Sequence, residues 1–361
     1  MKATIQSAAL LAVLNRVKPA AQCASKLDVL NCFHISVSSE LISVSATNLD
    51  LKITAEVPCS VKKKGEVLVS APRLLRIVSE IGNAEVDLSV DAKFSLAIKY
   101  GRNVHHLAGS SPDTFPKFDG PSDKAQSFKI QGETLKEVFT RLVPFASTDE
   151  TKYNLGGLCL EGGENGASLI ATDGRMLRQS PIIADVDGSF ILPSEMVKMV
   201  AGLCEPGEDV DVAVEDGAIA FKAASWGVDA KLIDSTYPKW RQVVPSDEES
   251  DILISGPVAT MIQAVRRAEA SVSDTVGSIQ LTLGDECTVK AVDSDNSSGE
   301  LHAEEWTATQ PLVFAVHPPF FRTMMRSFPS ENQTFRAKSE RHAIWQSDST
   351  GVAVVMPMRI S

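Results

Sequence analysis

The sequence predicts an α+β protein made of three copies of one unit of about 120 residues. Two observations support this fold class. Three kinds of segment recur along the 361-residue chain at intervals of about a third of its length. Each copy is also expected to contain two helices and several strands. Because solenoid repeats are shorter, each copy is expected to form a domain of its own.

The first recurring segment is a strand followed by an amphipathic helix. Its copies begin at Ile5, Ile130 and Ile254, with offsets of 125 and 124 residues. In the second copy Leu135, Val138 and Leu142 lie at helical spacing and form one apolar face. Pro257 is expected in the first turn of the third helix, where its missing N–H group does no harm.

The second and third recurring segments complete the unit. A β segment ends in a turn in which an alanine is followed two residues later by Asn48, Asp173 or Asp293, whose side chains favour turns. A later strand leads into a second helix, with serine or proline at the junction. The six helices are expected over residues 7–19, 71–81, 132–147, 194–203, 256–271 and 318–328.

Polar stretches separate the copies. They lie near residues 120–127 and 245–251, and the closing motif TFPKF at 114–118 returns as TYPKW at 236–240. The sequence therefore predicts three domains, 1–121, 122–247 and 248–361.

The composition limits the class of protein. No run of about 18 apolar residues is present, and the apolar N-terminal segment is interrupted by Gln6, Asn15 and Arg16, so it is interpreted as an amphipathic helix rather than a signal peptide. The six cysteines are scattered without a CxxC pair, which argues against zinc and against a disulfide framework. A cytoplasmic protein is expected.

The net charge of −11 is distributed unevenly. The six expected helices carry eleven basic and five acidic side chains, whereas the rest of the chain carries 24 basic and 41 acidic ones. Lys and Arg are good helix formers, so this excess can reflect ordinary solvated faces. The alternative interpretation is a basic helical surface that contacts a polyanion loosely and without reading its sequence.

The motifs of common catalytic sites are absent. There is no phosphate-binding GxxxxGK[ST] loop, no GxSxG and no HExxH. The segment from Asp293 to Glu304 is similar to a calcium loop, but Ser298 stands where glycine is needed. No enzyme, metal or cofactor is expected; a rival hypothesis is an enzyme with Asp173, Arg175 and Tyr153 as polar site residues, although no acid–base or nucleophile pair supports it.

Four further motifs indicate a family. They are YNLGGLCLE at 153–161, ATDGRML at 171–177, TYPKWRQVVP at 236–245 and VVMPMRI at 354–360. With these motifs in this order, the chain resembles the β subunit of bacterial DNA polymerase III, the β sliding clamp, over essentially its whole length. The resemblance implies the DNA-clamp fold and a head-to-tail homodimeric ring that encircles double-stranded DNA without reading its sequence.

The resemblance also implies a hydrophobic groove between the second and third domains. Short linear motifs of the replicative DNA polymerase, the clamp loader and repair proteins dock there. The groove residues are expected to be Leu155, Thr172, Gly174, Arg175, Met176, Leu177, Pro238, Val243, Val354, Met356, Pro357, Met358 and Arg359. Strand alternation is expected to place Met356 and Met358 on one face, opposite Val355; an ordinary core strand is the alternative.

Two further surfaces follow from the helix charges and the resemblance. The residues expected to face DNA are Arg73, Tyr153, Lys198, Arg266 and Arg267, and those expected at the dimer contact are His105, Leu107, Ala270 and Ser271. A protein hub that keeps the groove but not the DNA contact is an alternative.

The chain departs from the family pattern at three places. Arg175 and Met176 follow the ATDG motif, and Gln242 replaces an expected second arginine, so peptide preference is expected to differ. The dimer residues include few large apolar side chains, which predicts a weaker interface. His105 there predicts closure that depends on pH.

Overall fold

The computed structural model describes residues 1–21, 26–163, 166–272, 277–284, 286–292, 297–338 and 341–358. The chain forms two compact units, Met1–Lys136 with Met199–Leu232, and Glu137–Lys198 with Ile233–Ser361. Helices and antiparallel sheets are both present, which confirms the α+β class. The borders of the units fall inside helices α3 (Gly132–Leu142) and α4 (Ser194–Leu203). The division into three domains at residues 121/122 and 247/248 stays a prediction.

The first unit contains two sheets. In spatial order, the smaller sheet consists of β5 (Ser60–Lys63), β1 (Lys2–Gln6), β7 (Glu85–Val90), β8 (Leu96–Tyr100) and β9 (Asn103–Leu107). The nine-stranded sheet consists of β10 (Gly109–Ser110), β6 (Gly65–Ser70), β2 (Cys32–Ser38), β3 (Leu41–Thr47), β4 (Leu51–Pro58), β18 (Trp226–Lys231), β17 (Ala218–Lys222), β16 (Asp209–Glu215) and β11 (Gln126–Gln131).

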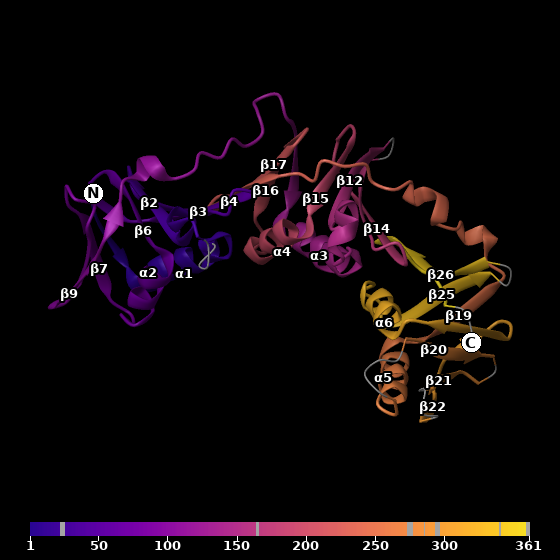
Figure 1. The fold of residues 1–361 in the computed structure, drawn as a ribbon. Helices are drawn as coiled ribbons and strands as arrows, with labels where there is room; N and C mark the ends of the chain where they lie inside the picture. Colours follow the sequence, from indigo (N-terminus) through magenta and orange to yellow (C-terminus); the bar gives the residue numbers. More distant parts are fainter. Residues whose placement is uncertain are drawn as a thin grey trace. The chain divides into compact units, whose positions relative to one another are not determined.

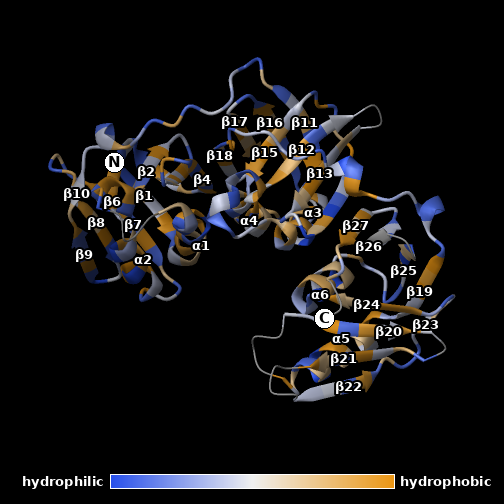
Figure 2. Ribbon diagram, turned by 45° about the vertical axis from the view of Figure 1, so that its right-hand side comes forward, coloured by the Kyte–Doolittle hydropathy of each residue, from blue (hydrophilic) through white to orange (hydrophobic). Residues whose placement is uncertain are grey.

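The second unit has the same plan. Its nine-stranded sheet consists of β15 (Ser189–Pro193), β12 (Gly157–Gly163), β13 (Gly166–Thr172), β14 (Met176–Ile182), β27 (Gly351–Val355), β26 (Arg341–Asp348), β25 (Asn332–Lys338), β19 (Ile252–Pro257) and β23 (Thr307–Ala308). Its smaller sheet consists of β22 (Ser298–His302), β21 (Thr288–Val292), β20 (Ile279–Leu283) and β24 (Leu312–Val316). Hydrophobic colour runs along many of these strands, while the loops are largely hydrophilic (Figure 2).

Helices cover the sheets in each unit (Figure 1). In the first unit α1 (Ser7–Val17) packs on β4 and on α2 (Ala71–Ser79); in the second, α5 (Val258–Glu269) packs on β22 and on α6 (Pro318–Arg326). All six expected helices are present, but α3 ends at Leu142 rather than at residue 147, because a 3₁₀ helix, Val143–Phe145, follows it. Helix α5 begins two residues later than expected, because Pro257 still belongs to strand β19 and stands at the N-cap, not in the first turn.

The first and second repeats carry the same turn. Thr47 Oγ1 donates to the Leu51 carbonyl at 2.8 Å, and Thr172 Oγ1 donates to the Met176 carbonyl at 2.6 Å. The side chains of Asn48 and Asp173 accept hydrogen bonds from the backbone N–H groups two and three residues later. The residue that follows has a positive φ in both turns, 79° at Leu49 and 90° at Gly174. The turn predicted at Asn48 and Asp173 is therefore present, with the same hydrogen bonds, in the first two repeats; the equivalent Asp293 lies outside the described residues.

Main-chain pairing joins the repeats. Strand β4 of the first repeat pairs antiparallel with β18 of the second, and β14 of the second pairs antiparallel with β27 of the third. Leu51 lies opposite Ala230, and Met176 lies opposite Val355, so both partners shift by 125 residues between the two junctions. The two junctions are therefore equivalent in register.

Arg178 of β14 is a fully buried cation at the second junction. Its Nη2 donates to the carbonyl and hydroxyl oxygens of Thr350, at 3.1 and 2.8 Å, and its guanidinium carbon lies 4.0 Å from the centre of the Phe328 ring. Within the described part of the chain, Nε and Nη1 have no hydrogen-bond partner. Burial lowers the pKa of Arg178 to about 10, so the charged form is less stable in the fold than in water.

Replacing Arg178 with methionine is expected to raise the free energy of unfolding by about 1–3 kcal/mol. The methionine fills similar space next to Phe328, and it removes two unsatisfied N–H groups together with the desolvated charge. Urea denaturation of both proteins measures the difference. A lower urea midpoint for Arg178→Met would show instead that the bonds to Thr350 outweigh the cost of burying the guanidinium.

Candidate functional site

The Thr172–Met176 turn shapes one wall of an apolar cavity in the second unit. Its hydrogen bonds hold Gly174 at a φ of 90°, which glycine adopts without strain. The backbone N–H of Met356 donates to the Arg175 carbonyl at 2.9 Å, so the chain beyond β27 stays attached to the turn. These contacts bring the turn and the end of β27 together.

The cavity has a volume of about 140 Å³. The segment that contains the 3₁₀ helix Trp240–Val243 forms another part of its wall. Its lining residues are Leu155, Thr172, Gly174, Arg175, Met176, Leu177, Pro238, Lys239, Trp240, Val243, Val354 and Met356. The exposed side chains of Val243 and Met356 make this cavity accessible to an apolar side chain of a partner.

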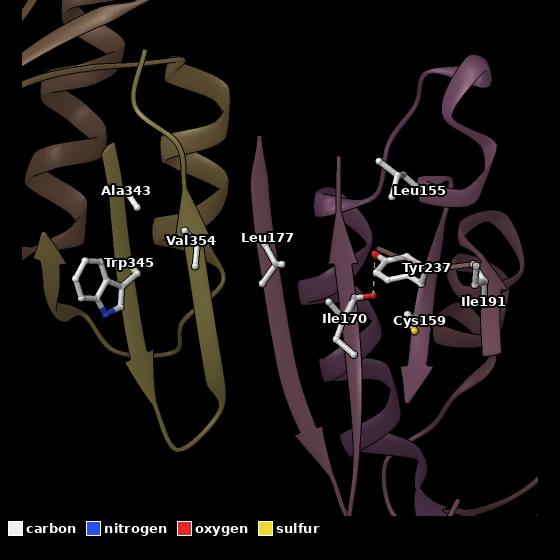
Figure 3. Packing of buried hydrophobic residues seen from close by; sticks show 9 residues of the cluster. All are labelled: Leu155, Cys159, Ile170, Leu177, Ile191, Tyr237, Ala343, Trp345 and Val354. Atoms are coloured by element: carbon white, nitrogen blue, oxygen red, sulfur yellow. Dashed lines mark hydrogen bonds between the residues drawn. The ribbon is translucent and has the colours of Figure 1, made fainter. Parts of the chain in front are cut away.

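A buried hydrophobic cluster shares residues with the cavity wall. Leu155, Leu177 and Val354 belong to both the cavity wall and the cluster, which also includes Trp345, the largest fully buried side chain of the described chain. Figure 3 shows the Tyr237 hydroxyl directed at the Ile170 carbonyl, which accepts its hydrogen bond at 3.4 Å. Burial raises the pKa of Tyr237, so this hydroxyl remains a neutral donor. The cavity therefore borders a buried, hydrogen-bonded part of the core.

Ten of the thirteen expected groove residues line this cavity: Leu155, Thr172, Gly174, Arg175, Met176, Leu177, Pro238, Val243, Val354 and Met356. Pro357 and Met358 do not line it. Strand β27 ends at Val355, and the Met358 N–H donates to the Ala315 carbonyl of β24 at 2.6 Å, so the expected alternation does not reach Met358. Arg359 lies outside the described residues.

Sequence reasoning missed Lys239 and Trp240 in the cavity wall. The Trp240 indole N–H donates to Glu161 Oε2 at 2.5 Å, and Arg241 Nη1 donates to Glu161 Oε1 at 2.6 Å. The Arg241 guanidinium carbon also lies 4.5 Å from the centre of the Trp240 ring. The one available signal was the repeated closing motif, which places an aromatic residue at Phe118 and at Trp240.

His317 lies near the same turn, at the N-cap of α6. Its ring is 4.4 Å from that of Phe320, and its Nδ1 is buried without a hydrogen-bond partner in the described structure. Burial lowers the pKa of His317, and the positive charges of Arg175 and Arg322 lower it further, against the opposing effect of Asp173 and Glu269. The neutral ring is therefore the form that the fold favours.

The stability of the protein is expected to fall as the pH drops below the ordinary histidine pKa of about 6.5, in part because of His317. In that range the unfolded chain binds a proton at this position more readily than the folded chain does, since the folded pKa is the lower one. Denaturation at pH 7.5 and pH 5.5 measures the loss. His317→Gln should lose less stability than the parent protein; equal losses would exclude a role for His317.

The helices carry two groups of basic side chains. Arg16 pairs with Glu205, Arg141 with Glu137, and Arg322 with Glu269. The expected DNA-facing residues Arg73, Lys198, Arg266 and Arg267 are exposed, and no acidic side chain of the described residues pairs with them. The same holds for Lys18, Arg76 and Arg326. Tyr153 is 60% exposed in the 3₁₀ helix Glu150–Leu155. The unpaired lysine and arginine side chains are therefore free to contact phosphates.

The expected dimer residues lie beside two sheet edges. His105 and Leu107 belong to β9, the last strand of the five-stranded sheet; the Tyr100 hydroxyl is 3.1 Å from His105 Nε2. Leu107 is buried, whereas the other four residues of β9 are exposed. Ala270 and Ser271 are exposed at the end of α5, and Ser271 lies against Gly299 of the edge strand β22.

The described part of the chain offers little for metal binding or for nucleophilic chemistry by cysteine. No group of three His, Cys, Asp or Glu residues there could hold a metal ion. Burial raises the pKa of Cys159 to about 11, so its thiol is a poor nucleophile. The calcium-like segment includes Asp293 and Asp295, which lie outside the described residues. No helix of the described structure is long and apolar enough to cross a membrane.

Comparisons with known proteins agree with one another. Residues 1–119 match the family "DNA polymerase III beta subunit, N-terminal domain", and residues 129–239 match its central domain. The "Beta sliding clamp" of Caulobacter vibrioides is 27% identical over 296 residues, 78% of each chain, and that of Chlamydia pneumoniae is 22% identical over 350 residues, 92% of each chain.

Solved structures show the same fold. The crystal structure of the DNA polymerase III subunit beta from Pseudomonas aeruginosa has a TM-score of 0.92 with 21% identity, and the match covers 100% of both chains. The pol III beta structure from Caulobacter crescentus has a TM-score of 0.89 with 23% identity, again over 100% of both chains.

Proposed function

This chain belongs to the DNA polymerase III beta subunit family of sliding clamps, and we propose that two copies close head to tail into a ring around double-stranded DNA. Sliding clamps are processivity factors and catalyse no reaction, so the chain needs no catalytic residues or cofactor. The ring tethers a replicative DNA polymerase during synthesis. It acts in the cytoplasm, at the replisome.

The repeated strand junction is the observation that carries ring closure. Repeats join through β4 with β18 and through β14 with β27, in the same register. The corresponding edges that remain are β22 of the third repeat and β9 of the first. A third junction of the same kind therefore needs a second copy of the chain, whose β9 pairs with β22. We infer that His105, Leu107, Ala270 and Ser271 lie at this contact, because they lie on or beside these two edges.

The unpaired cations of the helices support contact with DNA. Arg73, Lys198, Arg266 and Arg267 can approach phosphates without first breaking an ion pair. Contacts of this type do not read sequence, which suits movement along the duplex. Tyr153 is included by its exposure and by the family resemblance.

The apolar cavity supports docking of short peptides from partner proteins. Its wall combines Met176, Met356 and Val243 with the Thr172–Met176 turn, and methionine side chains adapt to different ligands. The partners we propose are the replicative polymerase, the clamp loader and other proteins that carry a clamp-binding motif. We infer that the groove also includes Lys239 and Trp240, because both line the wall of the apolar cavity.

The ring is tested by mass and by topology. Light scattering across a range of concentrations should show a species of twice 38.8 kDa that dissociates at low concentration. Protein loaded on nicked circular DNA should stay bound at high salt and be lost when the circle is cut, because retention depends on encirclement rather than on contacts. A protein that stays monomeric at all concentrations, or whose retention is the same on linear DNA, would contradict the proposal.

A further inference from the structure

A second, larger cavity shares wall residues with the first. It has a volume of about 550 Å³ and shares Pro238, Lys239 and Trp240 with the first cavity. Strands β12 and β15 supply Cys159, Glu161 and Ser189, and the segment from Ser235 to Gln242 supplies the rest of its wall. A peptide that places an apolar residue in the first cavity can therefore continue along Trp240 into the second.

The polar groups of this cavity favour a negatively charged ligand. Among the described residues of its wall, Glu161 carries the only carboxylate, and it already accepts hydrogen bonds from Trp240 at 2.5 Å and from Arg241 at 2.6 Å. Lys239 is exposed, and no acidic side chain of the described residues pairs with it. The remaining polar groups at the rim include the hydroxyls of Ser235 and Thr236 and the amide of Gln242, all of which can donate hydrogen bonds.

We propose that this second cavity binds an acidic residue next to the apolar anchor of a docked peptide, and that Lys239 determines this preference. The inference rests on the proposed docking function and adds the charge of the partner to it. Lys239 lines both cavities, so it can meet a carboxylate at the point where the peptide passes Trp240. A basic peptide residue would find Glu161 occupied by Arg241 and would lie close to the positive charge of Lys239.

The protein carries an intrinsic probe of this site. Of its four tryptophans, Trp226, Trp306 and Trp345 are at most 3% exposed, whereas Trp240 is partly exposed and lies in the wall of both cavities. A change in tryptophan emission on adding a peptide therefore reports on Trp240. The Trp240→Phe variant should lose this signal, which checks the assignment.

Six labelled peptides, one for each residue type and placement, test the charge preference in the full-length protein. All have Leu-Phe as the apolar anchor, and they carry three aspartates, three asparagines or three lysines, placed before or after the anchor. At low salt the best aspartate peptide should bind about three to ten times more tightly than its asparagine counterpart, and the lysine peptide should bind most weakly. In Lys239→Met the advantage of aspartate over asparagine should fall below about twofold.

Matched controls locate the effect. Lys64 is also exposed but lies between β5 and β6, so Lys64→Met removes the same charge and should keep the full aspartate preference. A carbodiimide should join the aspartate peptide to Lys239, and mass spectrometry of the digest identifies the linked lysine. Cross-linking to a different lysine would contradict the inference.

The outcomes distinguish a failure of the acidic subsite from a failure of peptide docking itself. If the asparagine and aspartate peptides bind equally well, or if the preference survives in Lys239→Met, the acidic subsite is wrong while docking in the groove stands. If no peptide binds and Trp240 emission never changes, docking itself fails and the subsite fails with it.

Discussion

A glutamate in place of Val243 is expected to weaken peptide docking by about 2–3 kcal/mol, roughly a hundredfold, with the ring left intact. Val243 is 43% exposed and lines the apolar cavity, so a carboxylate there would lose water whenever an apolar anchor is seated. The fold should tolerate the change, because the side chain reaches solvent when no peptide is bound.

Val313 provides a matched control for this variant. It is 44% exposed on β24 and is not part of the cavity wall, so Val313→Glu introduces the same charge at a similar exposure. Fluorescence anisotropy with a labelled clamp-binding peptide measures both variants, and melting temperatures check their folding. Equal affinities for Val243→Glu and Val313→Glu would mean that the peptide binds elsewhere.

Reversing Arg266 and Arg267 to glutamate should weaken DNA contact strongly without affecting the groove. A closed ring contains four of these arginines, and each phosphate contact contributes about 0.9 to the slope of log affinity against log salt. The double variant should therefore bind DNA at least about tenfold more weakly at low salt, and with a shallower salt dependence.

The control variant changes the net charge by the same amount at positions outside the helices. Lys64 and Lys124 are exposed and lie outside the six helices, so Lys64→Glu with Lys124→Glu lowers the net charge equally. Binding to duplex DNA and loading on circles are measured for both double variants, together with peptide affinity. Similar losses in both would show that net charge, rather than the helix surface, governs binding.

Periodicity and repetition predicted most of the fold. The buried positions Leu10, Val13, Leu14 and Val17 of α1 return in α5 as Met261, Ala264, Val265 and Ala268, and both faces can be recognised from spacing alone. The turn residues Asn48 and Asp173 were also identifiable, because their side chains bond to their own backbone. Local patterns of this type reveal elements and their faces.

Features that depend on distant contacts were not predictable. Trp240 acquires its position in two cavity walls from Glu161, which lies 79 residues away along the chain. Met358 does not line the apolar cavity, and its backbone N–H binds the Ala315 carbonyl of another strand. Arg178 lies at a strand position that pairing with β27 and the nearby Phe328 bury completely, although arginine is rarely found inside a protein.

The equal register of the two junctions shows that side chains there can change during evolution while the strand pairing is kept. Ile53 and Arg178 occupy equivalent positions, opposite Val228 and Ala353, although one is aliphatic and the other a cation. Backbone N–H and C=O groups form the hydrogen bonds between the paired strands, and every residue except proline supplies both groups. Mutations along these strands can therefore accumulate while the spacing of the repeats stays constant, and a solved structure with only 19% identity keeps the same fold.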